Sequence, residues 1–136
     1  MRDADVLDFG CGSGVLGIAA LSLGAARVHA SDNDPQALIA TRENAALNEM
    51  LDRIVIAPPD RLPELAPGLI LANILAATLE QHADRFASLQ PTGGRIVLSG
   101  ILADQLDTIV AAFGRHYRAF DTAELDGWLR VAAVRA

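Results

Sequence analysis

The sequence predicts an α/β protein with a doubly wound, seven-stranded and mostly parallel sheet, in which the last strand is antiparallel. Two observations predict this fold class. Short β-rich runs alternate with segments of helical periodicity, which is typical of parallel strands joined by crossover helices. A glycine-rich stretch follows the first apolar run directly. The chain has 136 residues, of which 51% are hydrophobic and 21% charged, so we expect one well-cored domain over 1–136.

The first half of the chain predicts three strands and two helices. Residues 4–9 form a strand, and the helical spacing over 13–24 predicts a helix that Gly24 stops. A second strand covers 27–31. The next helix begins with Asp34 as its cap and Pro35 at its first position, and runs to about Met50. Residues 53–57 form the third strand.

The second half begins with a proline-rich loop over 58–67. Strands at 68–74 and 95–100 and helices at 76–89 and 102–114 follow. The last segment, 116–134, contains two strands with few residues between them, which predicts an antiparallel hairpin. Ligands of doubly wound sheets bind beyond the carboxyl ends of the strands, so 10–14, 31–34, Asn73 and 99–100 are the candidate site.

Composition excludes several classes of function. The net charge of −6 argues against a nucleic-acid-binding surface, and no apolar run is long enough to span a membrane. The single cysteine, Cys11, excludes an internal disulfide and fits a reducing cytosol, so we expect a cytoplasmic protein without membrane contact. Three histidines, His29, His82 and His116, lie far apart. We expect each to be at the surface or hydrogen-bonded, and we expect no metal site.

The glycine stretch fits one class of cofactor better than another. Gly12, Gly14 and Gly17 satisfy the G-x-G-x-x-G fingerprint of nicotinamide dinucleotide sites. That frame begins two residues too late, because Gly10 is the glycine that follows the strand directly. The pattern is therefore Gly10-x-Gly12-x-Gly14, which still allows the backbone to approach a ligand at a helix N-terminus.

Asp8, at the end of the first strand, separates the two classes of cofactor. A carboxylate there repels an anionic pyrophosphate and attracts a cation. S-adenosylmethionine carries a sulfonium and an ammonium group and no phosphate, so we predict that Asp8 and the glycine loop bind this cofactor. The alternative is a helix-capping aspartate that faces solvent.

Two further polar residues stand at strand ends. Asp32 ends the second strand, where an acidic side chain can accept both hydrogen bonds of a ribose diol; the alternative is a turn residue. We expect Asp32→Ala to weaken binding of S-adenosylhomocysteine by about 1–3 kcal/mol, with little change in stability. Asn73 ends the fourth strand, where an unpaired amide is costly. We predict that it positions a substrate amine or contacts the cofactor, with capping of the next helix as the alternative.

Four stretches together resemble a known family: "VLDFGCGSGVLGIAAL", "ASDNDPQALIATRENAALN", "LANILA" and "LSGIL". They are similar to the catalytic domain of the enzymes that methylate ribosomal protein L-eleven, which have a Rossmann-like class I methyltransferase fold. The likeness extends to Trp128 and Arg130 near the end of the chain. The "LANILA" and "SGIL" stretches are its most specific part, and an Asn-Pro-Pro motif of amide and nucleobase methyltransferases is absent at Asn73.

The resemblance implies that Gly10, Asp32 and Asn73 contact S-adenosylmethionine, and that lysine and N-terminal amino groups of the ribosomal protein are methylated. The product would be S-adenosylhomocysteine, and no metal would be needed. The family's cofactor-binding threonine and its N-terminal recognition domain precede the first strand, and we expect both to be missing from this chain. Such a chain should bind the cofactor more weakly than an extended one and methylate the ribosomal protein poorly.

Three alternatives stay open at this point. The chain can be a stand-alone methyltransferase with another substrate. It can also be a cofactor-binding remnant without substrate recognition. A nicotinamide-dependent oxidoreductase is the third alternative, which Asp8 and the glycine spacing disfavour.

Overall fold

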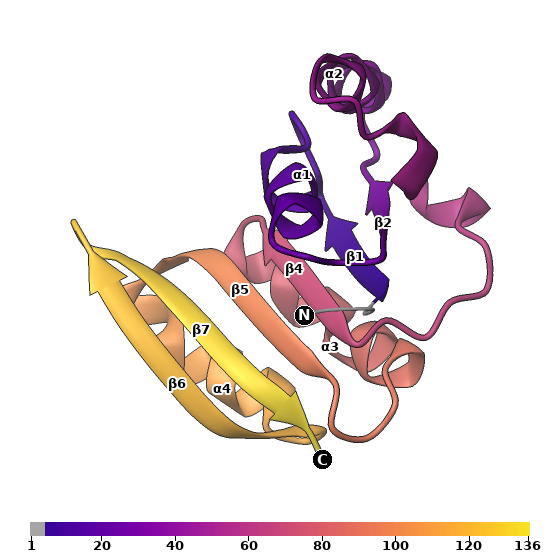
Figure 1. Ribbon diagram of the computed structural model, residues 1–136. Coiled ribbons are helices and arrows are strands. Elements are labelled where there is room, and N and C mark those ends of the chain that lie inside the picture. Colours follow the sequence, from indigo (N-terminus) through magenta and orange to yellow (C-terminus); the bar gives the residue numbers. More distant parts are fainter. Residues whose placement is uncertain (1–4) are drawn as a thin grey trace.

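The computed structural model describes residues 5–136 and contains a single seven-stranded sheet in the order β3-β2-β1-β4-β5-β7-β6. All strands but one run in parallel, and β7 is antiparallel to both β5 and β6 (Figure 1). This arrangement confirms the predicted fold class. The strands are β1 (Asp5–Phe9), β2 (Arg27–Ser31), β3 (Ile54–Ala57), β4 (Leu69–Asn73), β5 (Arg95–Leu102), β6 (Tyr117–Leu125) and β7 (Trp128–Arg135).

Four α-helices cover the sheet, and two separate apolar clusters mark its two faces. Figure 1 shows α3 and α4 behind the sheet, over the larger cluster, which includes Phe86, Phe113 and Ile96. The smaller cluster, with Val6, Val28 and Ala45, packs under α1 and α2. The helices are α1 (Val15–Ser22), α2 (Pro35–Leu47), α3 (Ala76–Leu89) and α4 (Leu106–Phe113), with short 3-10 helices η1 (Leu51–Arg53), η2 (Pro59–Arg61) and η3 (Ala103–Gln105).

Capping and turn residues in the sequence predict most of the helix and strand boundaries correctly. Asp34 caps α2 by accepting a hydrogen bond from the Gln36 amide at 2.9 Å, as predicted. Gly24 follows α1 with a φ of 109°, which stops the helix. The tip of the β6–β7 hairpin is formed by Asp126 and Gly127, with φ of 52° and 84°, the positive pair that a tight hairpin turn requires.

Two predicted helices begin later than expected. The first helix begins at Val15, because Gly14 has a left-handed φ of 84° that no helical residue adopts. The last helix does not begin at residue 102, because β5 continues to Leu102 past an irregularity. Ile101 is fully buried and pairs with Leu129, so core packing extends the strand where periodicity alone predicts a helix.

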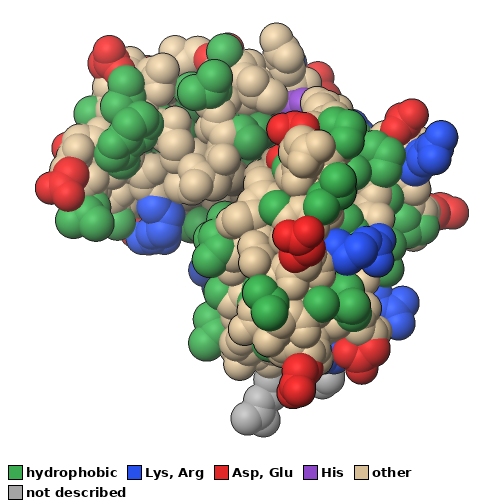
Figure 2. All heavy atoms as spheres, turned by 90° about the horizontal axis from the view of Figure 1, so that it is seen from above, with side chains coloured by type: hydrophobic (Ala, Val, Ile, Leu, Met, Phe, Trp, Pro, Cys, Tyr) green, Lys and Arg blue, Asp and Glu red, His purple; other side chains and the backbone are tan. Residues whose placement is uncertain are grey.

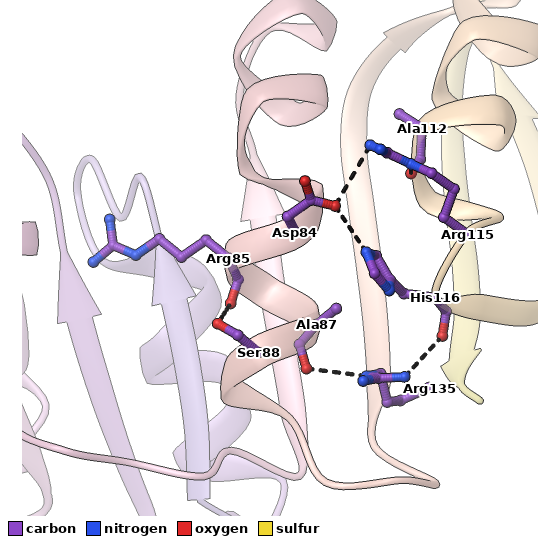
Figure 3. A network of polar contacts seen from close by, with 8 residues as sticks. All are labelled: Asp84, Arg85, Ala87, Ser88, Ala112, Arg115, His116 and Arg135. Atoms are coloured by element: carbon purple, nitrogen blue, oxygen red, sulfur yellow. Dashed lines mark hydrogen bonds and ion pairs between the residues drawn. The ribbon is translucent and has the colours of Figure 1, made fainter.

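The base of the β6–β7 hairpin is fastened to α3 by polar contacts (Figure 3). His116 Nε2 lies 2.7 Å from Asp84 Oδ1, and Arg115 Nη2 lies 3.5 Å from the same oxygen. The contact with His116 holds the pKa of Asp84 below its usual value. Arg135 donates to the carbonyl oxygens of Ala87 at 3.0 Å and His116 at 3.3 Å. These contacts lie at the end of the sheet opposite the candidate site.

One face of the sheet is only partly covered within residues 5–136. Over β4, β5 and β7, the side that carries α1 has no helix packed on it in Figure 1, and Leu69, Leu71 and Val97 are half-buried there. The view from above shows the result as a re-entrant corner between two lobes (Figure 2). No helix among these residues is long and apolar enough to cross a bilayer.

Candidate functional site

The glycine loop joins β1 to α1 and is tied to the end of the neighbouring strand. The amides of Gly10 and Cys11 both donate to the carbonyl oxygen of Ser31, at 2.8 and 2.9 Å. Gly10, Gly12 and Gly14 all have positive φ, of 75°, 55° and 84°. The loop therefore makes a tight turn that residues with side chains rarely adopt, directly before the N-terminus of α1.

The three glycines serve different purposes. A methyl group at Gly10 would overlap Ile74 Cγ2, and one at Gly14 would lie 2.8 Å from Thr41 Cγ2. Those two positions are glycine because neighbouring elements approach closely. Gly12 has nothing within 4 Å of the corresponding point, so the backbone there is open to a ligand.

Asp8 lies beneath this loop rather than on its surface. Its side chain is 1% exposed, and Oδ2 accepts a hydrogen bond from the Gly17 amide in the first turn of α1 at 3.0 Å. Burial raises the pKa of Asp8 to about 6, and the charge of Asp32 adds to this rise. The side chain does cap the helix, but it does not face solvent as the capping alternative assumed. Its contact with a cofactor stays a prediction.

Cys11 and Thr41 hold the loop against α2. Thr41 is fully buried, and its hydroxyl donates to the carbonyl oxygen of Gly12 at 3.0 Å and lies 3.3 Å from Cys11 Sγ. Burial raises the pKa of the Cys11 thiol to about 11, so the thiol stays protonated. These residues therefore support the loop and offer no nucleophile.

Asp32 cross-links the loop to the start of α2. Its Oδ2 accepts from the Gly12 amide at 3.0 Å, and its Oδ1 accepts from the Asp34 amide at 2.9 Å. The side chain is half-buried, and each oxygen retains a lone pair for a further donor. Asp32 lines a pocket of about 120 Å³. The other lining residues are Phe9, Gly10, Ser31, Asn33, Pro59, Ile74, Thr78 and His82.

Several of these pocket residues were missed by sequence analysis. Thr78 and His82 lie four residues apart and thus on one face of α3, but only the topology shows that this face meets β1. The His82 ring packs edge-on to Phe9 at 4.7 Å, and burial lowers the pKa of His82. Arg85 lies over the Phe9 ring and donates to the carbonyl oxygen of Pro59 at 3.1 Å, which fixes one rim of the pocket.

The expectation for the histidines holds only in part. His116 meets Asp84 in the contact described above. His29 on β2 is neither at the surface nor satisfied: it is 6% exposed, and its Nδ1 has no hydrogen-bond partner within residues 5–136. Burial lowers the pKa of His29, so the ring is neutral. His29 is buried because β2 is covered on both faces, where any side chain becomes buried. The sequence of β2 does not show this coverage.

Asn73 is the last residue of β4 and is exposed. The N-cap of α3 is Leu75, which has no side-chain capping bond, so the capping alternative for Asn73 is wrong. Asn73 Oδ1 lies 3.0 Å from the point where a Cβ of Gly100 would stand. It lines a second cavity, of about 470 Å³, while the next residue, Ile74, lines the Asp32 pocket.

Comparison with known proteins identifies the family. The model of the family "Ribosomal protein L11 methyltransferase (PrmA)" matches residues 1–136. The chain belongs to the ribosomal protein L11 methyltransferase family. A ribosomal protein L11 methyltransferase of Methylococcus capsulatus is 52% identical over 136 residues, and one of Pseudomonas aeruginosa is 46% identical over 131 residues. The match covers 99% and 96% of this chain but only 46% and 45% of those proteins, so the chain spans about half their length.

Solved structures agree with the assignment to this methyltransferase family. The ribosomal protein L11 methylase of Lactobacillus delbrueckii subsp. bulgaricus superposes with a TM-score of 0.88 at 32% identity, covering 99% of this chain and 71% of that one. A methyltransferase of Pyrococcus furiosus superposes with a TM-score of 0.83 at 12% identity, which shows a shared fold alone. It covers 98% of this chain and 75% of that structure. The predicted resemblance is thus confirmed.

Proposed function

We propose that this chain is an S-adenosylmethionine-dependent methyltransferase domain that methylates lysine and N-terminal amino groups of ribosomal protein L11. The observation that carries the proposal is the convergence of the glycine loop and Asp32 on one pocket, directly beside Asn73. The names of the relatives support this substrate, and a ribosomal substrate supports a reaction in the cytoplasm.

The residues of the Asp32 pocket fit the nucleoside part of S-adenosylmethionine. The Asp32 carboxylate is fixed by two backbone amides and can accept from a ribose diol. The Ser31 hydroxyl is fully buried, has no partner among the described residues, and belongs to a residue that lines the pocket. An unpaired buried hydroxyl costs free energy, and a ligand hydroxyl or amine would satisfy it. The apolar side chains of Ile74 and Pro59, which line the pocket, suit an aromatic base.

We assign the rest of the cofactor to the glycine loop and the acidic strand end. Gly12 is the point at which a ligand can approach the backbone, while Gly10 and Gly14 allow the loop to close. The buried Asp8 supplies negative potential under the loop whenever it is ionised, which favours a cationic ligand above it. Asn73 would meet the methionine end of the cofactor or the acceptor amine, because it lies between the two cavities.

The chemistry is an in-line displacement. The glycine loop, Asp32 and Asn73 would hold S-adenosylmethionine, which would supply a sulfonium methyl group for transfer to the acceptor nitrogen and would leave as S-adenosylhomocysteine. The chain contributes alignment of the amine at attack distance, where the Asn73 amide oxygen can accept from it. A lysine with a pKa of about 10.4 must first lose its proton, which costs roughly 4–5 kcal/mol at pH 7. Water can take this proton.

Calorimetric titration with S-adenosylhomocysteine and, separately, with NAD tests the cofactor assignment. We expect saturable binding of S-adenosylhomocysteine and none of NAD. Binding of NAD alone would overturn the proposal in favour of an oxidoreductase. A methyl-transfer assay on purified ribosomal protein L11 then tests the substrate. Because the chain contains no lysine, labelled lysine in the mixture derives from the substrate alone.

A further inference from the structure

Helix α2 holds the glycine loop with two of its own side chains. The Thr41 hydroxyl donates to the carbonyl oxygen of Gly12 at 3.0 Å, and the Asn44 side-chain amide donates to that of Ser13 at 2.8 Å. The two donors are three residues apart and therefore lie on one face of the helix. Two consecutive peptide groups of the loop are thus fixed from α2, although neither Thr41 nor Asn44 lines the Asp32 pocket.

Gly12 is the loop residue whose orientation depends most on hydrogen bonds. Gly10 and Gly14 are packed closely against neighbouring side chains, whereas nothing lies within 4 Å of the point where a Cβ of Gly12 would stand. The amide of Gly12 donates to Asp32 Oδ2 at 3.0 Å, and its carbonyl oxygen accepts from Thr41. Side chains from two different elements therefore fix this residue at both of its polar groups.

The bond from Thr41 determines which way the next amide points. The peptide group between Gly12 and Ser13 is planar and trans, so its N–H is directed opposite to its carbonyl. With the carbonyl held towards α2, the Ser13 amide faces away from that helix, just before the N-terminus of α1. Glycine permits either orientation of this peptide, and the open space around Gly12 does not prevent rotation. Loss of the hydroxyl would therefore free an amide that a ligand on this loop would meet.

The Thr41 hydroxyl is itself held in place. It is fully buried, and its oxygen lies 3.3 Å from Cys11 Sγ. A hydroxyl has one proton, and the carbonyl oxygen of Gly12 is a nearer and stronger acceptor than the sulfur. The Cys11 thiol is protonated, because burial raises its pKa to about 11, and it can donate to the hydroxyl oxygen. Cys11 thus directs the proton of Thr41 towards Gly12.

Helix α2 has few other attachments to the rest of the molecule. Only Thr41 and Ala45 are buried among its 13 residues, whereas α3 buries five of its 14. Figure 1 shows α2 at the margin of the molecule, beside α1 and the end of β2. At its start, Asp32 Oδ1 accepts from the Asp34 amide at 2.9 Å. The loop and the helix are therefore joined at the start and in the middle of α2, so a ligand that fixes one of them also fixes the other.

We propose that Thr41 and Asn44 are positioning residues for cofactor binding: from α2 they hold the peptide groups that follow Gly12 and Ser13 in the orientation that the ligand requires. Both act through the glycine loop and not by contact with the ligand. Because such coupling is reciprocal, a ligand that binds the loop also stabilises α2. The inference rests on the proposed function, since it concerns the same cofactor, and it adds a helix outside the pocket to the groups that determine affinity.

Two substitutions of Thr41 separate its hydroxyl from its methyl group. Thr41→Val keeps the shape and loses the hydrogen bond, whereas Thr41→Ser keeps the hydroxyl and loses the methyl group that packs at Gly14. We expect the calorimetric affinity for S-adenosylhomocysteine to fall about three- to tenfold in Thr41→Val and to stay within about twofold in Thr41→Ser, on the scale of one hydrogen bond. Thr108→Val, at an exposed position on α4, is the matched control and should bind like the wild type. A role in packing alone predicts the opposite order of the two Thr41 variants, and that order would overturn the inference.

Asn44→Ala is an independent variant that keeps the helix intact, because Asn44 is only half-buried and alanine favours the helix. We expect it to weaken binding of S-adenosylhomocysteine about threefold, since the Ser13 carbonyl loses its donor. Asn48→Ala is the control: Asn48 is exposed one turn later, and its amide donates within the helix, to the carbonyl oxygen of Asn44 at 2.8 Å. It should bind like the wild type. Equal affinities of these two variants would contradict the assigned role of Asn44.

Hydrogen exchange tests the reciprocal effect. Saturation with S-adenosylhomocysteine should slow the exchange of the α2 amides in the wild type, and should slow it less in Thr41→Val. A wild-type chain that does not bind S-adenosylhomocysteine would overturn the proposed function together with this inference. Equal affinity of the wild type and Thr41→Val, or equal protection of α2 by the ligand in both, would overturn this inference alone.

Discussion

The carboxyl edge of the sheet borders two cavities whose walls are built in different ways. Between β1 and β2, the groups that form the site are backbone amides and carboxylates that bond to them, as Asp32 does with Gly12. Between β5 and β7, they are exposed side chains such as Trp128 around a backbone bulge. We infer that substitutions on the β1–β2 side change stability and cofactor binding together. Those on the β5–β7 side should leave both the fold and cofactor binding intact.

The largest expected effect is that of Gly10→Ala. The new methyl group overlaps Ile74 at a position with a φ of 75°, so we expect a loss of about 2–4 kcal/mol in the free energy of unfolding, together with lost cofactor binding. Chemical unfolding and calorimetry measure the two quantities. Gly127→Ala is the control, since its φ of 84° is similar and nothing lies within 4 Å, so it should cost only about 1 kcal/mol. Equal losses would show that the contact with Ile74 is unimportant.

Asp8→Asn should remove a pH dependence of stability. The pKa of Asp8 rises from 3.8 to about 6 on folding, so the folded state favours the protonated form. This contribution is fully present below about pH 4 and is lost as the pH rises through 6. Relative to the variant, the wild type should therefore lose about 3 kcal/mol between about pH 4 and pH 7.

Urea unfolding across this pH range measures the effect of Asp8. Asp60→Asn, at an exposed position on η2, is the control and should leave the profile of the wild type unchanged. If the free energy of unfolding changes with pH in the same way in the wild type and in Asp8→Asn, the buried carboxylate does not control stability. That result would contradict the proposed difference between the β1–β2 and β5–β7 sides.

Asp32→Ala should weaken binding of S-adenosylhomocysteine by about 1–3 kcal/mol, the scale of hydrogen bonds to a charged group. From the sequence we expected little change in stability for this variant, and the structure revises that expectation. Because the carboxylate accepts from the amides of Gly12 and Asp34, the free protein should also lose about 1–2 kcal/mol of stability. Calorimetry and thermal unfolding without ligand measure the two effects. Undiminished affinity in the variant would remove Asp32 from the cofactor site.

Arg130→Ala should have the smallest effect. The pair with Asp121 is exposed, and such pairs contribute less than about 1 kcal/mol to stability. We expect thermal unfolding and affinity for S-adenosylhomocysteine to stay close to those of the wild type. A large loss of stability in this variant would contradict the difference between the β1–β2 and β5–β7 sides.

The fold was predictable because its signals are local. Alternating strands and helices, the Asp34–Pro35 helix start and the hairpin over the last residues all follow from patterns of a few residues. The extent of β5 was not predictable, because it depends on pairing of Ile101 with a strand that lies far along the chain. Tertiary pairing here overrides a helical periodicity that is genuine in the sequence.

The candidate site likewise has features that were predictable from the sequence and features that were not. The glycine loop, Asp32 and Asn73 were predictable because each stands at a strand end, where the topology brings them together. The burial of Asp8 was not, because the strand pattern does not show that α1 closes over it. His82 and Thr78 join the Asp32 pocket only through the packing of α3, which no spacing in the sequence reveals.

The residues Asn73 and Ile74 lie between two glycines, Gly10 of the loop after β1 and Gly100 of β5. A side chain at Gly10 would overlap Ile74 Cγ2, and one at Gly100 would lie 2.8 Å from the Ile74 carbonyl oxygen. In evolutionary terms, these positions are not free to change one at a time. A larger residue at either glycine requires a compensating change at Asn73 or Ile74. A bulkier residue at position 74 requires more space beside Gly10. Among homologues, we therefore expect positions 10, 74 and 100 to vary together. Substitutions around one cavity are then limited by the residues around the other.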